Sequence, residues 1–165
     1  MIWLRLAVFA VLVPGTTIVL LPILLLQSGW GGRVHLGVFS YIGWIPLLAG
    51  TALMLWCWYD FVTRGRGTPA PYDAPKQLVV SGPFRVVRNP MYVAGVAILI
   101  GMAIVFGAPG LLAYAAAFWV FTATFVLIYE QPTLRRKFGQ EYADYCARVP
   151  AWIPRARTAI GRETP

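Results

Sequence analysis

Four long apolar runs limit what this chain can fold into more than any other feature of its sequence. They occupy residues 3–26, 36–62, 90–106 and 110–129. A helix needs about 20 apolar residues to cross the hydrocarbon core of a bilayer. The runs therefore predict an all-α membrane protein with about four transmembrane helices.

The composition agrees with a membrane environment and argues against a soluble fold. Hydrophobic residues make up 59% of the 165 positions and charged residues only 12%, whereas soluble domains carry about 25% charged residues. A soluble core of this size cannot bury so much apolar surface. The sequence has no internal repeat and no long low-complexity segment, so we expect residues 1–165 to form a single domain.

Details of the runs predict how the spans are built. A secretory signal peptide is the alternative for the first run, but "LLLQSGW" offers no small-residue cleavage site, so we expect a retained span. Gly43, Pro46 and Gly50 are expected to be positions of kinking or close packing in the second run. The third run is short, and we expect it to form a helical hairpin with the fourth through "GAPG" at 107–110.

The Lys and Arg residues predict the topology. The formal net charge is +8, and every Lys and Arg except Arg33 lies near the N-terminus, in the connector 63–89 or in the tail 130–165. Because cytoplasmic loops carry an excess of cations, both termini, the connector and the tail are predicted to be cytoplasmic. We expect a multi-pass protein of the inner or plasma membrane whose cations meet anionic membrane lipids rather than nucleic acid.

The stretch "GPFRVVRNPMYVAG", residues 82–95, brings cations to the start of the third span. Asn is a favoured N-cap and Pro a favoured first helical residue, so Asn89 and Pro90 predict where that helix begins. A helix N-terminus has free N–H groups that suit an anion, and Arg85 and Arg88 add positive charge, with Tyr92 one turn further on. A plain helix cap beside lipid headgroups is the alternative.

A second group of polar residues follows the fourth span. Glu130 lies where this span leaves the bilayer, and an ionisable group at that depth is a functional candidate. From Glu141 onward an apolar stripe predicts an amphipathic cytosolic helix at the membrane surface, with Tyr142, Tyr145, Cys146 and Val149. A zwitterionic small molecule would fit between the arginines at the third span and Glu130.

Other kinds of site find little support in the sequence. His35 is the only histidine and is expected to lie in a loop, so no histidine metal cluster and no Ser/His/Asp triad can be assembled. Cys57 and Cys146 have no metal-ligand spacing, and we expect both to be reduced and structural. The sequence predicts no metal site.

The stretch "LVVSGPFRVVRNPMYVAG", followed about 35 residues later by "YEQPTLRRKFGQEYADYCARVPAWIPR", resembles the superfamily of isoprenylcysteine carboxyl methyltransferases and phospholipid methyltransferases. The resemblance extends over residues 76–155. It implies an integral membrane enzyme that binds S-adenosylmethionine at the cytosolic end of its helices. It also implies a lipophilic small molecule or lipid as the methyl acceptor.

The resemblance carries over residue by residue. It implies cofactor binding by Arg88, Asn89, Tyr92 and Glu130. Asn89 stands where the family usually has histidine, so no acid or base role is assigned there. Gln131 replaces the second glutamate of a pair, and the expected small residue is Gly95, one position later than usual; both are still expected at the cofactor site.

The methyl acceptor decides which catalytic roles the residues take. A carboxylate acceptor, as in an isoprenylcysteine-like molecule, needs no base, and Arg85 or Arg135 would orient it. An amine acceptor, as in a phosphatidylethanolamine-type N-methyltransferase, needs a base, for which Glu130 is the candidate. An NADPH-dependent membrane reductase and a non-enzymatic scaffold are the alternatives from other classes. The sequence leaves open the acceptor, the number of methyl transfers and the oligomeric state.

Overall fold

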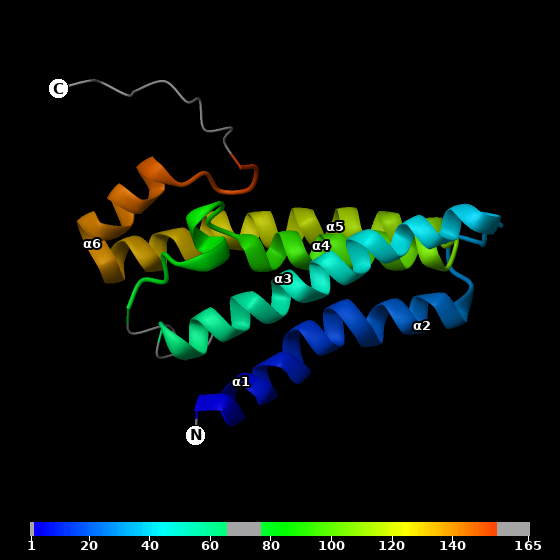
Figure 1. The fold of residues 1–165 in the computed structure, drawn as a ribbon, viewed down its shortest axis with the longest axis horizontal. Coiled ribbons are helices and arrows are strands. Elements are labelled where there is room, and N and C mark those ends of the chain that lie inside the picture. Colours follow the sequence, from blue (N-terminus) through cyan, green and yellow to red (C-terminus); the bar gives the residue numbers. More distant parts are fainter. Residues whose placement is uncertain (1, 66–76, 155–165) are drawn as a thin grey trace.

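The computed structural model describes residues 2–65 and 77–154, and every regular element in these residues is helical (Figure 1). The all-α prediction is therefore confirmed. Most of the Pro/Gly-rich connector and the end of the tail lie outside the described residues. The elements are α1 Ile2–Ala10, η1 Val11–Leu20, α2 Leu21–Ser28, η2 Gly37–Gly43, α3 Trp44–Thr63, η4 Gly82–Arg85, α4 Pro90–Val105, α5 Pro109–Phe125, η5 Val126–Glu130 and α6 Gln131–Arg148.

The first span runs through α1, η1 and α2 and widens into a π-helix at η1. Leu21 N–H bonds to Thr16 O, five residues back, which is the π-helical register. In that register the carbonyl of Thr17 would accept from residue 22, but Pro22 has no N–H to give. The hydroxyl of Tyr114 on α5 donates to this carbonyl instead, at 2.8 Å. The missing N–H of Pro22 thus explains why the Thr17 carbonyl accepts a hydrogen bond from Tyr114 in the fourth span.

The second span, η2 with α3, packs closely against α4 through glycines. A Cβ added at Gly50 would lie 2.8 Å from the carbonyl oxygen of Ala94, and one added at Gly101 would lie 2.6 Å from the backbone nitrogen of Leu47. Gly43 faces Val105 at a similar distance. Small residues let membrane helices approach until their backbones touch. The predicted close packing at Gly43 and Gly50 is therefore confirmed.

The third and fourth spans form the predicted hairpin. α4 ends at Val105 and α5 begins at Pro109, with a tight connection at Gly107 and Ala108. Gly107 has a positive φ of 56°, and its carbonyl accepts from Val34 N–H at 2.7 Å. This turn also holds the loop between the first and second spans against the hairpin.

The fourth span continues without a break through η5 into α6, which turns sharply at Gly139. There φ is 53° and ψ is −124°, values that no α-helix contains. Beyond the turn, Tyr142 and Tyr145 are buried, whereas Glu141 is exposed. The predicted amphipathic helix is therefore present, and its apolar stripe faces the bundle.

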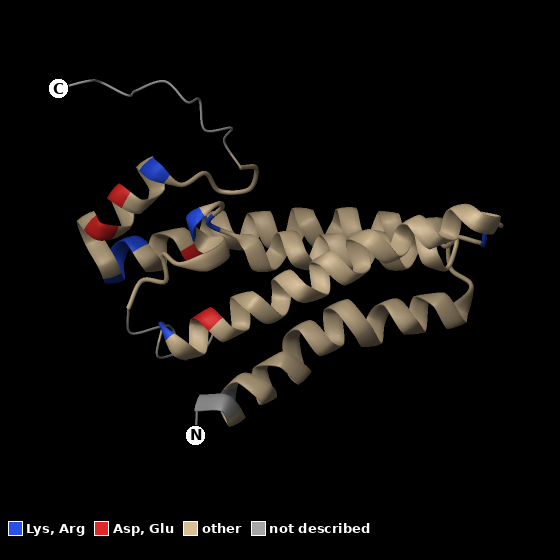
Figure 2. Cartoon of the chain, in the orientation of Figure 1, with Lys and Arg blue, Asp and Glu red and all other residues tan. Residues whose placement is uncertain are grey.

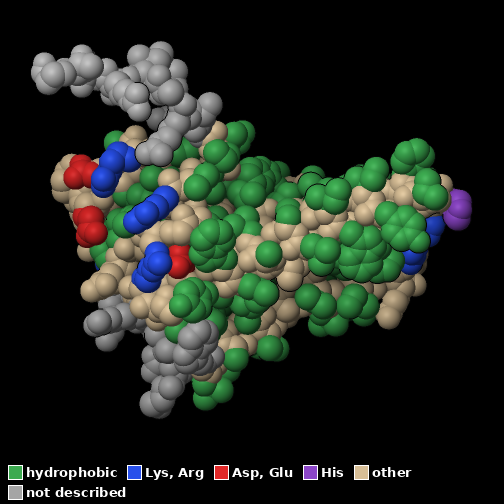
Figure 3. All heavy atoms as spheres, viewed as in Figure 1, with side chains coloured by type: hydrophobic (Ala, Val, Ile, Leu, Met, Phe, Trp, Pro, Cys, Tyr) green, Lys and Arg blue, Asp and Glu red, His purple; other side chains and the backbone are tan. Residues whose placement is uncertain are grey.

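The dimensions of the helices fit a bilayer. Within the described residues, three helical stretches are long and apolar enough to cross a membrane, Leu6–Ser28, Gly37–Thr63 and part of Pro109–Arg148, and the shorter apolar α4 lies among them. Among the coloured residues of Figure 2, most Lys and Arg gather at one end of the bundle, here called the cationic end, and a single blue position lies at the other end. Hydrophobic side chains cover much of the surface between the ends (Figure 3).

Candidate functional site

A cavity of about 380 Å³ extends from the cationic end into the apolar part of the bundle. Its walls come from the first span, α3, α4, α5, η5, α6 and the segment before α4. The polar end is formed by Arg88, Asn89, Tyr92, Glu130, Tyr142 and Tyr145. The apolar part is formed largely by Phe9, Val13, Pro14, Ile18, Met54, Phe118, Phe121 and Phe125. One cavity therefore adjoins both a charged region and a lipid-like region.

Tyr92 and Glu130 meet at the polar end. The hydroxyl of Tyr92 donates to Glu130 Oε2 at 2.9 Å, which joins the first turn of α4 to the end of η5. Glu130 is the last residue of a π-helical turn, and such turns are frequent at functional sites because they redirect side chains. The start of the third span and the carboxylate of the fourth therefore meet at one end of the cavity.

Arg88 contributes a cation whose hydrogen-bonding capacity is underused. Its Nη1 donates to the thiol sulfur of Cys146 at 2.6 Å, and sulfur is a weak acceptor. Its Nε is buried without a hydrogen-bond partner. A guanidinium that is half-buried, as Arg88 is, commonly forms charge-assisted bonds with an anion, so this side chain suits a carboxylate or phosphate ligand.

Asn89 takes the N-cap position of α4, as predicted, but its side chain makes no capping bond. Its Nδ2 donates instead to Ala151 O at 3.2 Å, and its backbone N–H donates to the same oxygen at 3.1 Å. The amides of Met91 and Tyr92, in the first turn, consequently lack both an intrahelical and a side-chain cap acceptor. They face the end of the helix where an anion is favoured.

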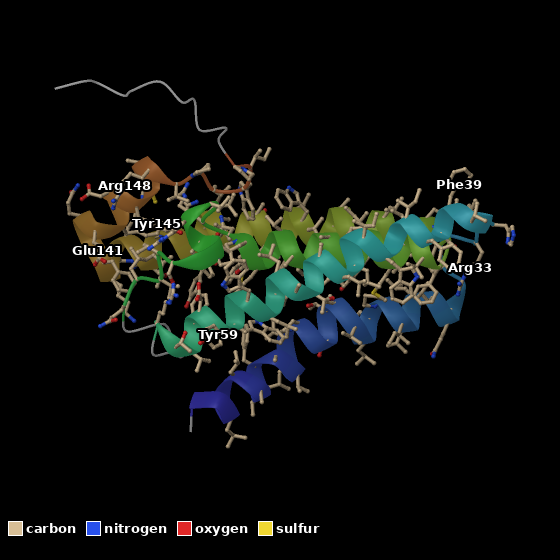
Figure 4. All side chains as sticks on the ribbon, in the orientation of Figure 1. Arg33, Phe39, Tyr59, Glu141, Tyr145 and Arg148 are labelled. Carbon is tan, nitrogen blue, oxygen red and sulfur yellow. The ribbon has the colours of Figure 1, made fainter. Side chains whose placement is uncertain are left out.

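Tyr142 and Tyr145 reach the cavity from α6 and were not predicted as site residues. The hydroxyl of Tyr145 donates to Phe84 O at 2.7 Å, which fastens α6 to η4. Figure 4 shows Tyr145 with Glu141 and Arg148 at the cationic end, opposite Arg33. The signal in the sequence was the apolar stripe itself, which marks the face of α6 that packs inward.

Asp60, near the end of α3, is a buried acid that sequence reasoning overlooked. Its side chain is only 1% exposed. Ser81 Oγ donates to Oδ2 at 3.3 Å, and Arg64 Nε lies 3.7 Å from Oδ1. Asp60 lies outside the cavity wall. An acid at the end of an apolar run was the available signal.

Four other predicted site residues lie outside the cavity wall. Gly95 is buried at a helix crossing, where an added Cβ would lie 3.0 Å from Ile18 and 3.1 Å from the ring of Phe118. Gln131 is half-buried, and Arg85 and Arg135 are exposed. The cavity therefore brings together Arg88, Asn89, Tyr92 and Glu130 from the predicted set.

Thr17 and Thr122 bring hydroxyl groups to the apolar part of the cavity, and both hydroxyls are already bonded. Thr17 donates to Val13 O at 2.8 Å, and Thr122 donates to Phe118 O at 2.8 Å. Each acceptor belongs to the same helix as its donor. This part of the wall consequently suits a hydrocarbon chain better than a polar ligand.

Metal-binding residues do not gather in the described part of the chain. No three His, Cys, Asp or Glu side chains within it lie close enough together to hold an ion. The two cysteines, Cys57 and Cys146, are both free thiols.

Comparisons with known proteins identify the family to which the chain belongs. The chain is 28% identical over 160 residues to the cobalt-zinc-cadmium resistance protein CzcN of Cupriavidus metallidurans, covering 97% of this chain and 68% of that protein. It is 26% identical over 139 residues to the nickel-cobalt-cadmium resistance protein NccN of Alcaligenes xylosoxydans xylosoxydans, covering 84% of this chain and 61% of that protein. The model of the phospholipid methyltransferase family matches residues 38–141. Because that match takes in more than half of the chain and includes the Arg88 and Glu130 motifs, the protein belongs to the phospholipid methyltransferase family of integral membrane proteins.

Proposed function

We propose that this protein is an S-adenosylmethionine-dependent methyltransferase whose acceptor is a lipophilic molecule from the membrane. The observation that carries the proposal is that one cavity joins the half-buried Arg88, whose Nε has no hydrogen-bond partner, and the Tyr92–Glu130 pair to an apolar chamber. Membership of a methyltransferase family supports it. We place the polar end of the cavity on the cytoplasmic side, because cations favour that side.

The residues at the polar end fit the charged groups of S-adenosylmethionine. Arg88 and the free amides at the start of α4 would hold its carboxylate. Glu130, oriented by Tyr92, would balance its positive charge. Gln131, next to Glu130, and Gly95, which lets α4 approach its neighbours, are proposed to support the site from outside the wall.

When bound, the cofactor would supply a methyl group activated by a sulfonium: the acceptor nucleophile would bond to the methyl carbon, and S-adenosylhomocysteine would leave with the electrons of the broken carbon–sulfur bond. The protein then mainly has to orient the acceptor and exclude water. The apolar wall would hold the hydrocarbon part of the acceptor, with its nucleophile toward Glu130. Arg85 and Arg135, exposed at the cationic end, are proposed to contact an anionic headgroup.

The acceptor is either a carboxylate or an amine, and the two make different demands on Glu130. A carboxylate attacks without losing a proton. A phosphatidylethanolamine-type amine is protonated in water and must give up a proton first, for which Glu130 is the base. Incubating the protein with methyl-labelled S-adenosylmethionine and a membrane lipid extract would identify the labelled product and decide between them.

Binding of the cofactor can be tested separately from turnover. We expect Arg88→Ala and Glu130→Gln each to weaken binding about 10- to 100-fold, because a hydrogen bond to a charged group contributes about 1.5–3 kcal/mol. Isothermal titration of the purified full-length protein in detergent measures this directly.

Arg136→Ala is the matched control for the binding test. Arg136 is an exposed cation on α6 whose Nε bonds to Pro132 O of its own helix, so its removal should leave the affinity unchanged. Equal affinity in all three variants would show that the site is misplaced. Absence of binding by the unmodified protein would show that the proposed function is wrong.

A further inference from the structure

Residues 149–152, here called the strap, cross the start of α4. Arg88 N–H donates to Pro150 O at 2.8 Å, and the backbone and side chain of Asn89 both donate to Ala151 O. About 60 residues of chain separate the partners in these bonds, so the strap is a long-range contact. It also lies beyond residue 141, where the family match ends.

The sequence of the strap explains why it is extended and available for these bonds. α6 ends at Arg148, and Val149 takes an extended conformation with φ −117° and ψ 124°. Pro150 follows, and proline disfavours helix in the residue before it. The segment therefore leaves the helix and presents its carbonyls to Arg88 and Asn89. Two residues of the polar cavity wall thus have their backbones tied to one short segment.

Trp152 adds an aromatic contact to these backbone bonds. Its ring centroid lies 4.6 Å from that of Trp119 on α5 and 6.3 Å from that of Tyr92 on α4. Trp152 does not line the cavity, whereas Tyr92 does and donates to Glu130. Trp152 consequently touches the site through Tyr92, and it bridges the two helices that carry the Tyr92–Glu130 pair.

We propose that the strap positions the polar end of the cavity, and that Trp152 is a positioning residue for Tyr92 and Glu130. The expected effect on cofactor affinity rests on the proposed function, because the residues that the strap positions are those assigned to S-adenosylmethionine. It assigns a role to a segment outside the family match. In this scheme Trp152 does not contact the substrate. It affects the affinity for S-adenosylmethionine only through Tyr92 and Glu130 in the cavity wall.

The first test measures the strap without any ligand. Hydrogen–deuterium exchange of the full-length protein in detergent, followed in peptides that contain Arg88 and Asn89, reports on the amides bonded to the strap. We expect Trp152→Leu to speed this exchange about fivefold or more, since aromatic pairs contribute measurably to local stability. Trp152→Phe keeps an aromatic ring and should stay close to the unmodified protein.

Trp44→Leu is the matched control, because Trp44 is a partly exposed tryptophan at the start of α3, away from the cationic end. If Trp152→Leu does not fold, Trp152→Met replaces it, since methionine fills irregular space. Exchange at Arg88 and Asn89 that is the same in Trp152→Leu and the unmodified protein would overturn the proposal.

The second test asks whether the strap matters for the site. Titration with S-adenosylmethionine should show at least fivefold weaker binding for Trp152→Leu, recovery in Trp152→Phe and no change in Trp44→Leu. Faster exchange with unchanged affinity would also overturn the positioning role. If the unmodified protein binds no S-adenosylmethionine, the proposed function is wrong, and the exchange result alone decides whether the strap holds Arg88 and Asn89.

Discussion

Asp60 is a buried acid whose side-chain oxygens are only partly hydrogen-bonded. A carboxylate that is 1% exposed loses its hydration, and here Ser81 and a distant Arg64 only partly replace it. Its Oδ1 has no hydrogen-bond partner. Gly82 packs so closely that an added Cβ would collide with Oδ2. The close contact between Asp60 and Gly82 therefore joins the end of α3 to the segment that leads into Arg88.

Gly82→Ala should destabilise the protein for two separable reasons. The φ of 51° is left-handed, which costs a non-glycine residue about 1–2 kcal/mol. The collision with Asp60 should add about 1–3 kcal/mol. The free energy of unfolding, measured by titration with a denaturing detergent, checks the sum.

Gly29→Ala isolates the first of these costs. Gly29 has a φ of 70° and no neighbour within 4 Å of an added Cβ. In an Asp60→Ala background the part of the Gly82→Ala cost that comes from the collision with Oδ2 should disappear, while the contact of the added Cβ with Trp56 Nε1, at 2.9 Å, remains. The same cost in both backgrounds would show that Asp60 does not confine Gly82.

Individual residues show what sequence reasoning can and cannot reach. Asn89 and Pro90 were correctly predicted to begin a helix, because capping depends on neighbours in the chain. The partner of the Asn89 side chain, Ala151, was not predictable, because it comes from a distant segment. The roles of Arg85, Gln131 and Arg135 stay predictions, since no observation here tests them.

At the scale of elements, the first span is tied to the hairpin by the Tyr114–Thr17 hydrogen bond. We expect Tyr114→Phe to lower the free energy of unfolding by about 0.6–1.7 kcal/mol, the range for hydrogen bonds between membrane helices. This loss is expected because Pro22 leaves the Thr17 carbonyl without a donor in its own helix, so the Tyr114 hydroxyl is its hydrogen-bond partner. Unfolding in detergent measures the loss.

A second substitution tests this explanation. Pro22→Ala restores an N–H that can reach the carbonyl within its own helix, so Tyr114→Phe should cost less in that background. A double-mutant cycle gives the coupling. Additive effects would contradict the assignment of Pro22 as the cause.

Elements differ in how far the sequence predicts them. The hairpin at 107–110 and the amphipathic face of α6 follow from local patterns and were predicted correctly. The π-helical segments η1 and η5 were not predicted. Hydropathy marks which residues are apolar but not which of two helical registers their backbone takes, and that choice depends on neighbouring helices.

For the whole molecule, the charge distribution predicts orientation. Introduced cysteines at His35 and Glu141, in a background without Cys57 and Cys146, would lie at opposite ends. We expect a membrane-impermeant maleimide to label the His35→Cys variant in intact cells and the Glu141→Cys variant only in inverted vesicles, because cations favour the cytoplasmic side. Labelling in the reverse sense would place the candidate site on the other side of the membrane.

The π-helical turn η5 affects how the protein tolerates a change in the length of its fourth span. Each residue of an α-helix advances the chain by about 100° of rotation, so one inserted or deleted residue normally turns everything beyond it to a new face. The π-helical turn at Val126–Glu130 absorbs that rotation in a single place. Deleting one residue within η5 should therefore return this turn to the α-helical register and leave Glu130 and α6 in phase with Tyr92.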